Sequence, residues 1–508
     1  MGVDRRLAPA ATVLCPLAAV ALVLCAAARP SAAQELRHLE IAADAAVTAT
    51  DNGNESATQP QSDVLVSLRP RIQFARRGTG LSIVGSAEAE MIGSTRGSRP
   101  SRILPAGAIN AEATLIDRVL RIDAGARVSQ VEQDVFGARL DGNATLGKRT
   151  AGTYRAAPVL EMEGPSGTLL TARYDLTRTR FAGTDVGDTD SRIGSVRFGM
   201  RPRPLGVGLE WSSESTDYAG VGVDVRSERL AGLLATSIYD EWLLGVLAGR
   251  ERSELAGQWS SDAFYGFRAS WVPGPRTKVS ASLERHYFGN GGRLDARHRT
   301  PSTAVVLEFV RDPVNAGTAT VVAPGLNQFL DAILTTRNPD EAARQALVDS
   351  LIAGRGLQGT ALGATAAHAN YPQLRTGGQF GWVFLQSRTT LTVTATVQQF
   401  RRLQRLDGVT AGAATDDFRL RGISLGWNRR LTPQLSLDVG ADRVSVEGLA
   451  NRLGESTRER AVRASLTQNL SPKTNGSLGL RFRRVSSNVA ETQSFDETAI
   501  FVGLGHRF

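Results

Sequence analysis

The chain ends with the segment DETAIFVGLGHRF, which runs from Asp496 to Phe508. Side chains of an extended chain alternate between two faces, so every second residue from Ile500 to Phe508 lies on the same side. That side carries isoleucine, valine, leucine, histidine and phenylalanine, whereas the other side carries Ala499, Phe501, two glycines and Arg507. The alternation predicts a β-strand with one apolar face, and the chain stops on an aromatic residue of that face.

Many similar segments precede this one. The clearest runs from Thr390 to Gln398, where four apolar residues alternate with four threonines and a glutamine. Segments 205–212, 265–271 and 477–483 alternate in the same way. A soluble β-sandwich would also alternate, but its strands usually have about five or six residues. These segments extend over about ten to thirteen residues, which suits tilted strands that cross a bilayer.

The connections between these segments alternate in length. Short connections are expected at 164–166, 202–204, 240–241, 273–276 and 432–434. Longer polar connections are expected at 131–151, 181–190, 218–226, 253–262, 402–417, 447–458 and 487–496. Short periplasmic turns and long external loops are typical of outer-membrane barrels. Five aromatic residues near the short turns would form an interfacial girdle: Trp211, Trp242, Trp271, Phe384 and Trp427.

About twenty-one candidate strands follow one another from Leu39 onward, and a closed bacterial barrel needs an even number. We therefore predict an all-β fold, a transmembrane antiparallel β-barrel of about 20–22 strands. No apolar run of 18 residues follows the N-terminal region, which excludes a helical membrane protein. The expected location is the bacterial outer membrane.

The N-terminal region has the form of a cleavable secretory signal. Arg5 and Arg6 precede an apolar run from Leu7 to Ala28, and Ser31-Ala32-Ala33 supplies the small residues of a cleavage site. A retained membrane anchor is the alternative, but Pro16 interrupts the run. We predict a signal peptide at 1–33 and a mature barrel at 34–508. Both cysteines lie within the signal and follow leucine, which argues against a lipoprotein.

The net charge is +9, and the positive charge is almost entirely arginine. A basic balance is compatible with nucleic-acid binding, but the sequence has no basic cluster combined with an aromatic stacking platform. We therefore expect no nucleic-acid partner.

One long break, at 312–372, interrupts the series of strands. Gly325 to Thr336 is expected to form a short helix, and Asn338-Pro339 is a typical start for a second one. An apolar stripe formed by Ala343, Leu347 and Leu351 continues that helix toward Gly354. The insert is interpreted as a plug or gate for the lumen, and the alternative is a helical loop resting on the rim.

The sequence contains no nucleophile elbow, phosphate loop or metalloprotease motif, and no two of its five histidines have metal-ligand spacing. A relay of Ser280, Ser282, Glu284 and His286 is unfavourable, because residues two apart on one strand do not converge. We expect no enzyme activity, no catalytic residues, no cofactor and no metal.

The predicted lumen face is rich in charge. Its candidate lining residues are Arg173, Arg197, Arg268, Arg463, Arg481, Arg483, Glu210 and Asp438. One hypothesis is a lumen with a positive excess that selects an anionic polymer. The alternative is cross-strand ion pairing that satisfies a polar interior.

Several short stretches resemble the outer-membrane barrels associated with exosortase (PEP-CTERM) systems. They are AADAAVTATDN (42–52), SLRPRIQF (67–74), RIDAGARVSQ (121–130), RYDLTRTRF (173–181) and LNQFLDAILTTRNPDE (326–341). The resemblance implies a conduit or accessory for exopolysaccharide export, with outer-membrane lipid, anionic polysaccharide and periplasmic export proteins as partners. The terminal Phe508 is similar to the signal read by the barrel assembly machinery.

Two further functions stay open. The first is a general diffusion or uptake channel for small solutes, although no plug domain is expected ahead of the first strand, which disfavours active uptake. The second is an outer-membrane enzyme.

Overall fold

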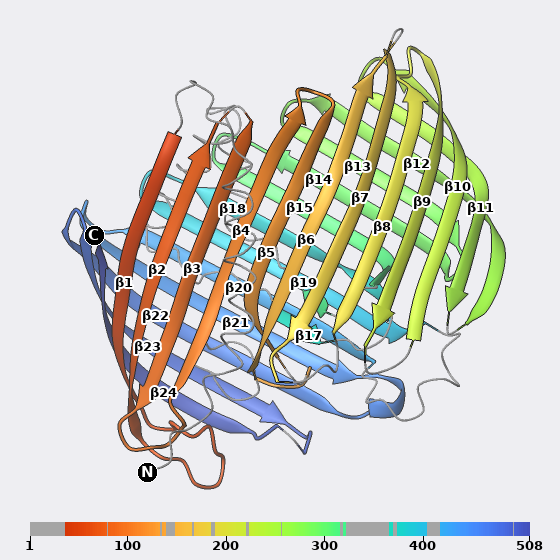
Figure 1. Ribbon diagram of the computed structural model, residues 1–508. Helices are drawn as coiled ribbons and strands as arrows, with labels where there is room; N and C mark the ends of the chain where they lie inside the picture. The colour runs from red at the N-terminus through yellow and green to blue at the C-terminus, as the bar shows by residue number, and fades with distance from the viewer. Residues whose placement is uncertain are drawn as a thin grey trace, which may run out of the picture.

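The computed structural model describes residues 36–78, 80–132, 135–138, 148–164, 167–183, 188–219, 223–255, 257–314, 318–321, 365–368, 373–403, 417–490 and 492–508. The chain forms one β-sheet that closes on itself (Figure 1). Each wall strand pairs antiparallel with the next, β15 pairs directly with β18, and β24 pairs back with β1. The ring therefore holds 22 strands, and a short antiparallel pair of strands, β16 and β17, is joined to it only at β5 within the described residues.

The first half of the ring consists of β1 (Leu36–Thr50), β2 (Asp63–Arg77), β3 (Leu81–Ser94), β4 (Arg102–Ile116), β5 (Leu120–Glu132), β6 (Lys148–Glu163), β7 (Thr168–Phe181), β8 (Thr189–Met200), β9 (Leu205–Tyr218), β10 (Val223–Ile238) and β11 (Trp242–Leu255). The second half consists of β12 (Gln258–Gly274), β13 (Thr277–His286), β14 (Gly289–Arg299), β15 (Thr303–Val314), β18 (Gln373–Leu385), β19 (Thr389–Arg402), β20 (Phe418–Arg430), β21 (Leu435–Gly448), β22 (Ser456–Ser471), β23 (Thr474–Ser487) and β24 (Phe495–Arg507). The separate pair consists of β16 (Thr318–Val321) and β17 (Thr365–His368).

The two faces of the wall differ as the alternating sequence predicts. On β9, Leu205 is 65 % exposed on the outside, whereas Glu210 is 8 % exposed on the inside. On β19, Thr392, Thr394 and Thr396 are buried on the lumen side. In a closed ring every strand has hydrogen-bonded neighbours on both sides, so no backbone edge is left unpaired. An apolar outer face with a polar inner face suits contact with lipid. The protein is an all-β outer-membrane barrel, and its strand number lies within the predicted range.

The two ends of the barrel also differ. Connections such as 201–204, 275–276 and 472–473 are short and lie at one end, where β1 also begins and β24 ends. The connections at the other end, here called the long-loop end, include 51–62, 133–147, 403–417 and 488–494. The prediction of a long connection at 253–262 is wrong, because β11 continues to Leu255 and β12 already begins at Gln258.

Aromatic residues partly follow the predicted girdle. Trp242 and Trp271 pair across β11 and β12, and their rings stack with centroids 5.4 Å apart. Trp382 and Phe384 stack in the same way on β18, at 6.2 Å. Trp211 lies further from the short turns, in the middle of β9, where it is paired with Val196 and Leu230.

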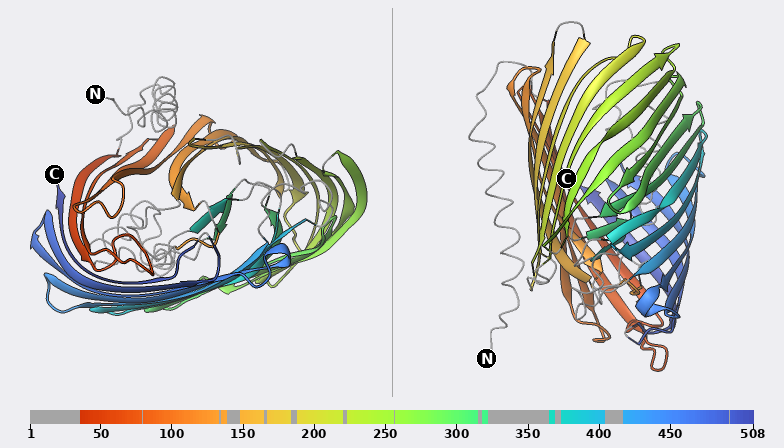
Figure 2. Two further views of the ribbon diagram at one scale, coloured as in Figure 1. Left: turned by 90° about the horizontal axis from the view of Figure 1, so that it is seen from below. Right: turned by 90° about the vertical axis from the view of Figure 1, so that its right-hand side faces the viewer.

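The predicted signal peptide at 1–33 and the predicted helices at 325–354 lie outside the described residues. No helix within the described residues is long and apolar enough to span a membrane. The wall strand β15 continues to Val314, so the first residues of the predicted insert 312–372 belong to the barrel. The β16–β17 pair lies within the outline of the ring, which is elongated in cross-section (Figure 2). A single parallel bridge, between Ala367 and Glu132, joins this pair to β5.

Candidate functional site

Charged side chains gather on the lumen side of five consecutive strands. One acidic or basic residue comes from each of β9 to β12, and two come from β13. We call this group the β9–β13 cluster: Glu210, Arg229, Glu251, Arg268, Glu284 and His286. The alternation of each strand directs these side chains inward. They follow a diagonal across the register, since Arg229 is directly opposite Glu251 whereas Arg268 is directly opposite Gly245.

Arg268 is the centre of the β9–β13 cluster. Its Nε donates to Glu284 Oε1 and its Nη1 donates to Glu210 Oε1, both over 2.8 Å. Arg229 Nη1 lies 3.5 Å from the second oxygen of Glu284. Charge-assisted hydrogen bonds of this kind offset the cost of removing the carboxylates from water. The cluster thereby ties β9, β10, β12 and β13 together across the lumen face.

His286 extends the cluster toward the long-loop end. Its Nδ1 is 3.3 Å from Glu251 Oε1, and its Nε2 is 3.4 Å from Glu284 Oε2. The ring stacks on Phe288, with centroids 4.8 Å apart, and a tilted contact joins it to Phe264 at 5.2 Å. This packing fills the lumen beside β11–β13 with side chains.

A second charged group surrounds Arg483 of β23. Arg483 is fully buried, donates from Nε to Glu459 Oε1 over 2.6 Å, and places Nη1 3.8 Å from Glu497 Oε2. Arg481 Nη2 donates to the other oxygen of Glu497 over 2.8 Å. We call the set the Arg483 cluster: Glu55, Arg99, Glu459, Arg481, Arg483 and Glu497.

Glu55 enters the Arg483 cluster from a loop rather than from the wall. It belongs to the connection 51–62 at the long-loop end, and its carboxylate accepts from Arg483 Nη1 over 3.1 Å. Asn52 secures the start of this connection, because its side-chain amide donates to Ser56 O and Asp496 O, each over 2.9 Å. Glu55 has a φ of 52°, a left-handed conformation that is uncommon for residues other than glycine. The loop therefore folds into the barrel mouth, where Glu55 is held by wall residues.

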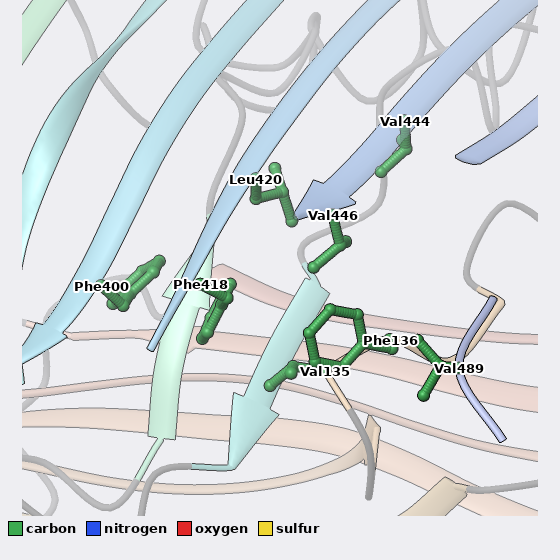
Figure 3. Packing of buried hydrophobic residues seen from close by; sticks show 8 residues of the cluster. All are labelled: Val135, Phe136, Phe400, Phe418, Leu420, Val444, Val446 and Val489. Carbon is green, nitrogen blue, oxygen red and sulfur yellow. The ribbon is translucent and has the colours of Figure 1, made fainter. Parts of the chain in front are cut away.

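A second loop crosses the lumen near the same end. Val135 and Phe136 follow β5, and both are buried against the opposite wall (Figure 3). Eight strands separate β5 from β20 in the shorter direction around the ring, so this contact spans the interior. We call residues 135–138 the bridging segment. The residues that it joins into one apolar cluster are Val135, Phe136, Phe400, Phe418, Leu420, Val444, Val446 and Val489.

Phe136 is the centre of the bridge. The Arg452 guanidinium lies 4.7 Å from the centre of its ring, and its carbonyl accepts from Thr492 Oγ1 over 3.2 Å. Phe400 and Phe418 stack with centroids 4.9 Å apart on the facing wall. The bridge is thus made by side chains from the β5–β6, β21–β22 and β23–β24 connections and from the wall of β19–β21. Together with the 51–62 loop, it narrows the lumen at the long-loop end.

The remaining predicted lining residues take part in smaller contacts. Arg173 lies 2.9 Å from Asp123 and 2.7 Å from Asp175, and Arg197 lies 3.8 Å from Glu210. Asp438 accepts from Asn428 Nδ2 over 2.7 Å, and Arg463 lies beside Gly440 on the same side of the wall. Arg173 and Arg197 thus each have a carboxylate partner on another strand, as the ion-pairing alternative predicts.

Sequence reasoning missed several residues of these sites. Alternation along β22 and β24 is sufficient to place Glu459 and Glu497 on the lumen face, so these two members of the Arg483 cluster could have been predicted from sequence. Glu55, Arg99 and Phe136 carried no such signal, because they lie in connections whose path depends on distant contacts. Among the described residues, no three histidine, cysteine, aspartate or glutamate side chains are placed to hold a metal ion.

No family model and no curated protein matches the sequence. Several solved structures are distantly similar. The siderophore receptor PirA from Pseudomonas aeruginosa is 11 % identical, over 95 % of this chain and 81 % of its own, with a TM-score of 0.43. The FrpB iron transporter from Neisseria meningitidis (F5-1 variant) is 10 % identical, over 92 % and 82 %, with a TM-score of 0.48. Similarity of this size assigns no substrate to the chain.

Proposed function

We propose that the barrel passes small solutes across the outer membrane, through a lumen that inward-folded loops close in the observed conformation. The observation that carries the proposal is the bridging segment. Phe136 reaches the facing wall of β19–β21 and is buried there, rather than lying over the rim. A segment that crosses the lumen controls passage through it.

The loops and the wall are held by different kinds of contact. Continuous ladders of hydrogen bonds join the strands, whereas the bridge depends on one cluster of apolar side chains and a few polar contacts. Segments with few contacts open at lower free energy than the sheet that carries them. The bridging segment can therefore leave the wall while the barrel stays folded, which is what a gate requires.

Export of exopolysaccharide is the function that the resemblance to exosortase-associated barrels implies. A path for an anionic polymer would need cations that hold it weakly at many points. Within the described part of the lumen, Arg268, Arg481 and Arg483 instead engage carboxylates of the wall. This pairing favours passage of small solutes over transport of a polyanion.

The test uses the full-length protein in planar bilayers and in proteoliposomes loaded with small sugars. Phe136→Ala combined with Val489→Ala removes the apolar contacts of the bridge and should raise both single-channel conductance and sugar efflux. Phe267→Ala is the matched control, because Phe267 is 46 % exposed on the lipid side of β12. It should leave both quantities unchanged.

Two results would count against the proposal. If neither the wild type nor the bridge variant conducts or releases sugar, the barrel is not a solute passage. If deletion of the gene removes surface polysaccharide while solute uptake stays normal, the export function replaces the one proposed here.

A further inference from the structure

We propose that the outer face of β20–β23 binds the phosphate groups of the glycolipid in the outer leaflet, at a row of three arginines. We call Arg443, Arg460 and Arg484 the arginine row. The proposal concerns the lipid-facing surface, and it does not depend on what passes through the lumen.

The register of the sheet places these side chains next to one another. Arg443 of β21 is directly opposite Arg460 of β22, and Arg460 is directly opposite Arg484 of β23. All three are exposed, whereas their neighbours Val444 and Glu459 are buried on the lumen side. Three adjacent strands therefore present three guanidinium groups in one line on the outside of the barrel.

Such a row is unfavourable without an anion. Like charges directly opposite each other destabilise a pair of strands. Arg484 is balanced at one end by Asp496 of β24, with hydrogen bonds of 2.6 and 2.7 Å. The described residues provide no ion pair for Arg443 or Arg460, and exposed Arg458 adds further positive charge two residues away. A bound anion between Arg443 and Arg460 would remove this repulsion.

The position of the row identifies the anion. Along β22 the next outward residue toward the short turns is Val462, which is 50 % exposed, and along β23 it is Phe482, at 43 %. The row thus lies at the edge of the apolar outer band, on the side of the long loops. In an outer-membrane barrel that edge meets the headgroups of the outer leaflet. The phosphates of a phosphorylated glycolipid lie at this boundary.

Arginine suits this partner in particular. Its planar guanidinium binds phosphate oxygens through two parallel hydrogen bonds, and it is always charged. The acyl chains of the same molecule would contact the apolar surface on the short-turn side of the row, where Leu425 is 47 % and Val462 is 50 % exposed. The arginine row and this apolar surface together match a lipid that carries both groups.

The test compares the full-length wild type with Arg443→Gln combined with Arg460→Gln. The control is Arg429→Gln combined with Lys473→Gln, which removes the same charge from exposed positions at the short-turn end of this wall. Each protein is reconstituted with bisphosphorylated lipid A, with dephosphorylated lipid A, or with neither. Retention of the lipid through detergent washing is measured by native mass spectrometry, and inorganic phosphate and a uronic-acid polymer serve as competitors.

We expect the row variant to retain about tenfold less bisphosphorylated lipid A than the wild type. The control should match the wild type, and dephosphorylated lipid A should bind all three proteins equally. Heat-modifiable gel mobility reports on folding. Without lipid, the row variant should unfold at the same temperature as the wild type or at a higher one. With bisphosphorylated lipid A, the wild type should unfold at the higher temperature. A row variant that does not fold is replaced by the single Arg460→Gln variant.

Three outcomes would overturn the proposal. Equal retention of bisphosphorylated lipid A by the wild type and the row variant would show that the row does not bind it. Equal loss in the control would show a general effect of charge. Displacement of lipid A by the uronic-acid polymer, but not by phosphate, would assign the row to a polysaccharide instead.

Discussion

The two charged clusters of the lumen are alike in composition and different in construction. The β9–β13 cluster takes every member from consecutive strands of the wall. The Arg483 cluster joins wall residues of β22–β24 to Glu55, which the 51–62 loop brings in from the mouth of the barrel. The first cluster strengthens the wall, whereas the second also fixes a loop to it.

The difference shows how one type of interaction can serve two purposes. Within the wall, the hydrogen-bond ladder already fixes the backbone of the charged residues, so the formation of their ion pairs costs little additional conformational entropy. A loop residue such as Glu55 must be ordered by the contact itself, and the loop loses conformational entropy when that contact forms. The Arg483 cluster should therefore combine a large contribution to stability with control over loop position.

The largest effect is expected from Arg483→Gln. This change leaves Glu459 and Glu497 buried without their main cation and should lower the free energy of unfolding by about 3–5 kcal/mol. Urea titration of the detergent-solubilised barrel, followed by gel mobility, measures the loss. Arg484→Gln is the matched control on the neighbouring outward position, and it should leave the urea midpoint unchanged. A small loss for Arg483→Gln would mean that water or Arg481 compensates the two carboxylates.

A smaller effect is expected from Arg268→Gln in the β9–β13 cluster. Glu210 and Glu284 lose a hydrogen-bond donor, but Arg229 and His286 still face Glu284. We expect a loss of about 1–2 kcal/mol in the same urea titration. A loss as large as that of Arg483→Gln would remove the distinction between the two clusters. Both variants also leave carboxylates in the lumen, so any conducted current should become more cation-selective.

Glu55→Gln addresses the loop alone. The wall keeps Glu459 and Glu497 as partners of Arg483, so the free energy of unfolding should fall by only about 1 kcal/mol. The loop should nevertheless detach more often, and limited proteolysis should cut within 51–62 faster than in the wild type. Glu284→Gln is the comparison variant, and it should leave this cleavage rate unchanged. Equal cleavage in the wild type and Glu55→Gln would show that Asn52 and its neighbours hold the loop without Glu55.

Thr394→Val provides the baseline for the wall. The Thr394 hydroxyl is buried on the lumen side and has no hydrogen-bond partner among the described residues. Replacing it with an apolar group of similar shape should change the free energy of unfolding by no more than about 0.5 kcal/mol. The urea midpoint should therefore match that of the wild type. A clear loss would point to a hydrogen bond, through water, that matters for the wall.

The wall was predictable from sequence because its information is local. The alternation at Leu391, Val393 and Thr394 determines which side chain faces lipid, independently of any distant residue. Arg268 and Arg483 were placed on the lumen face by the same reasoning. Their partners on other strands require the register, which no single segment contains. To predict that Glu55 and Phe136 turn inward, one would also need the positions of wall residues that are hundreds of positions away in the sequence.

The seam between the first and last wall strands has a consequence for assembly. Nine residue pairs join β1 to β24, from Ala42–Arg507 to Thr50–Ala499, whereas fifteen pairs join β1 to β2. The partners lie at opposite ends of the sequence, so this joint has the highest contact order in the ring and closes only after β24 has been synthesised. Until this joint closes, the nascent sheet stays laterally open there while lipid-facing strands enter the bilayer. The last residue takes part in the closure, because the backbone N–H of Phe508 donates to Ile41 O over 2.9 Å.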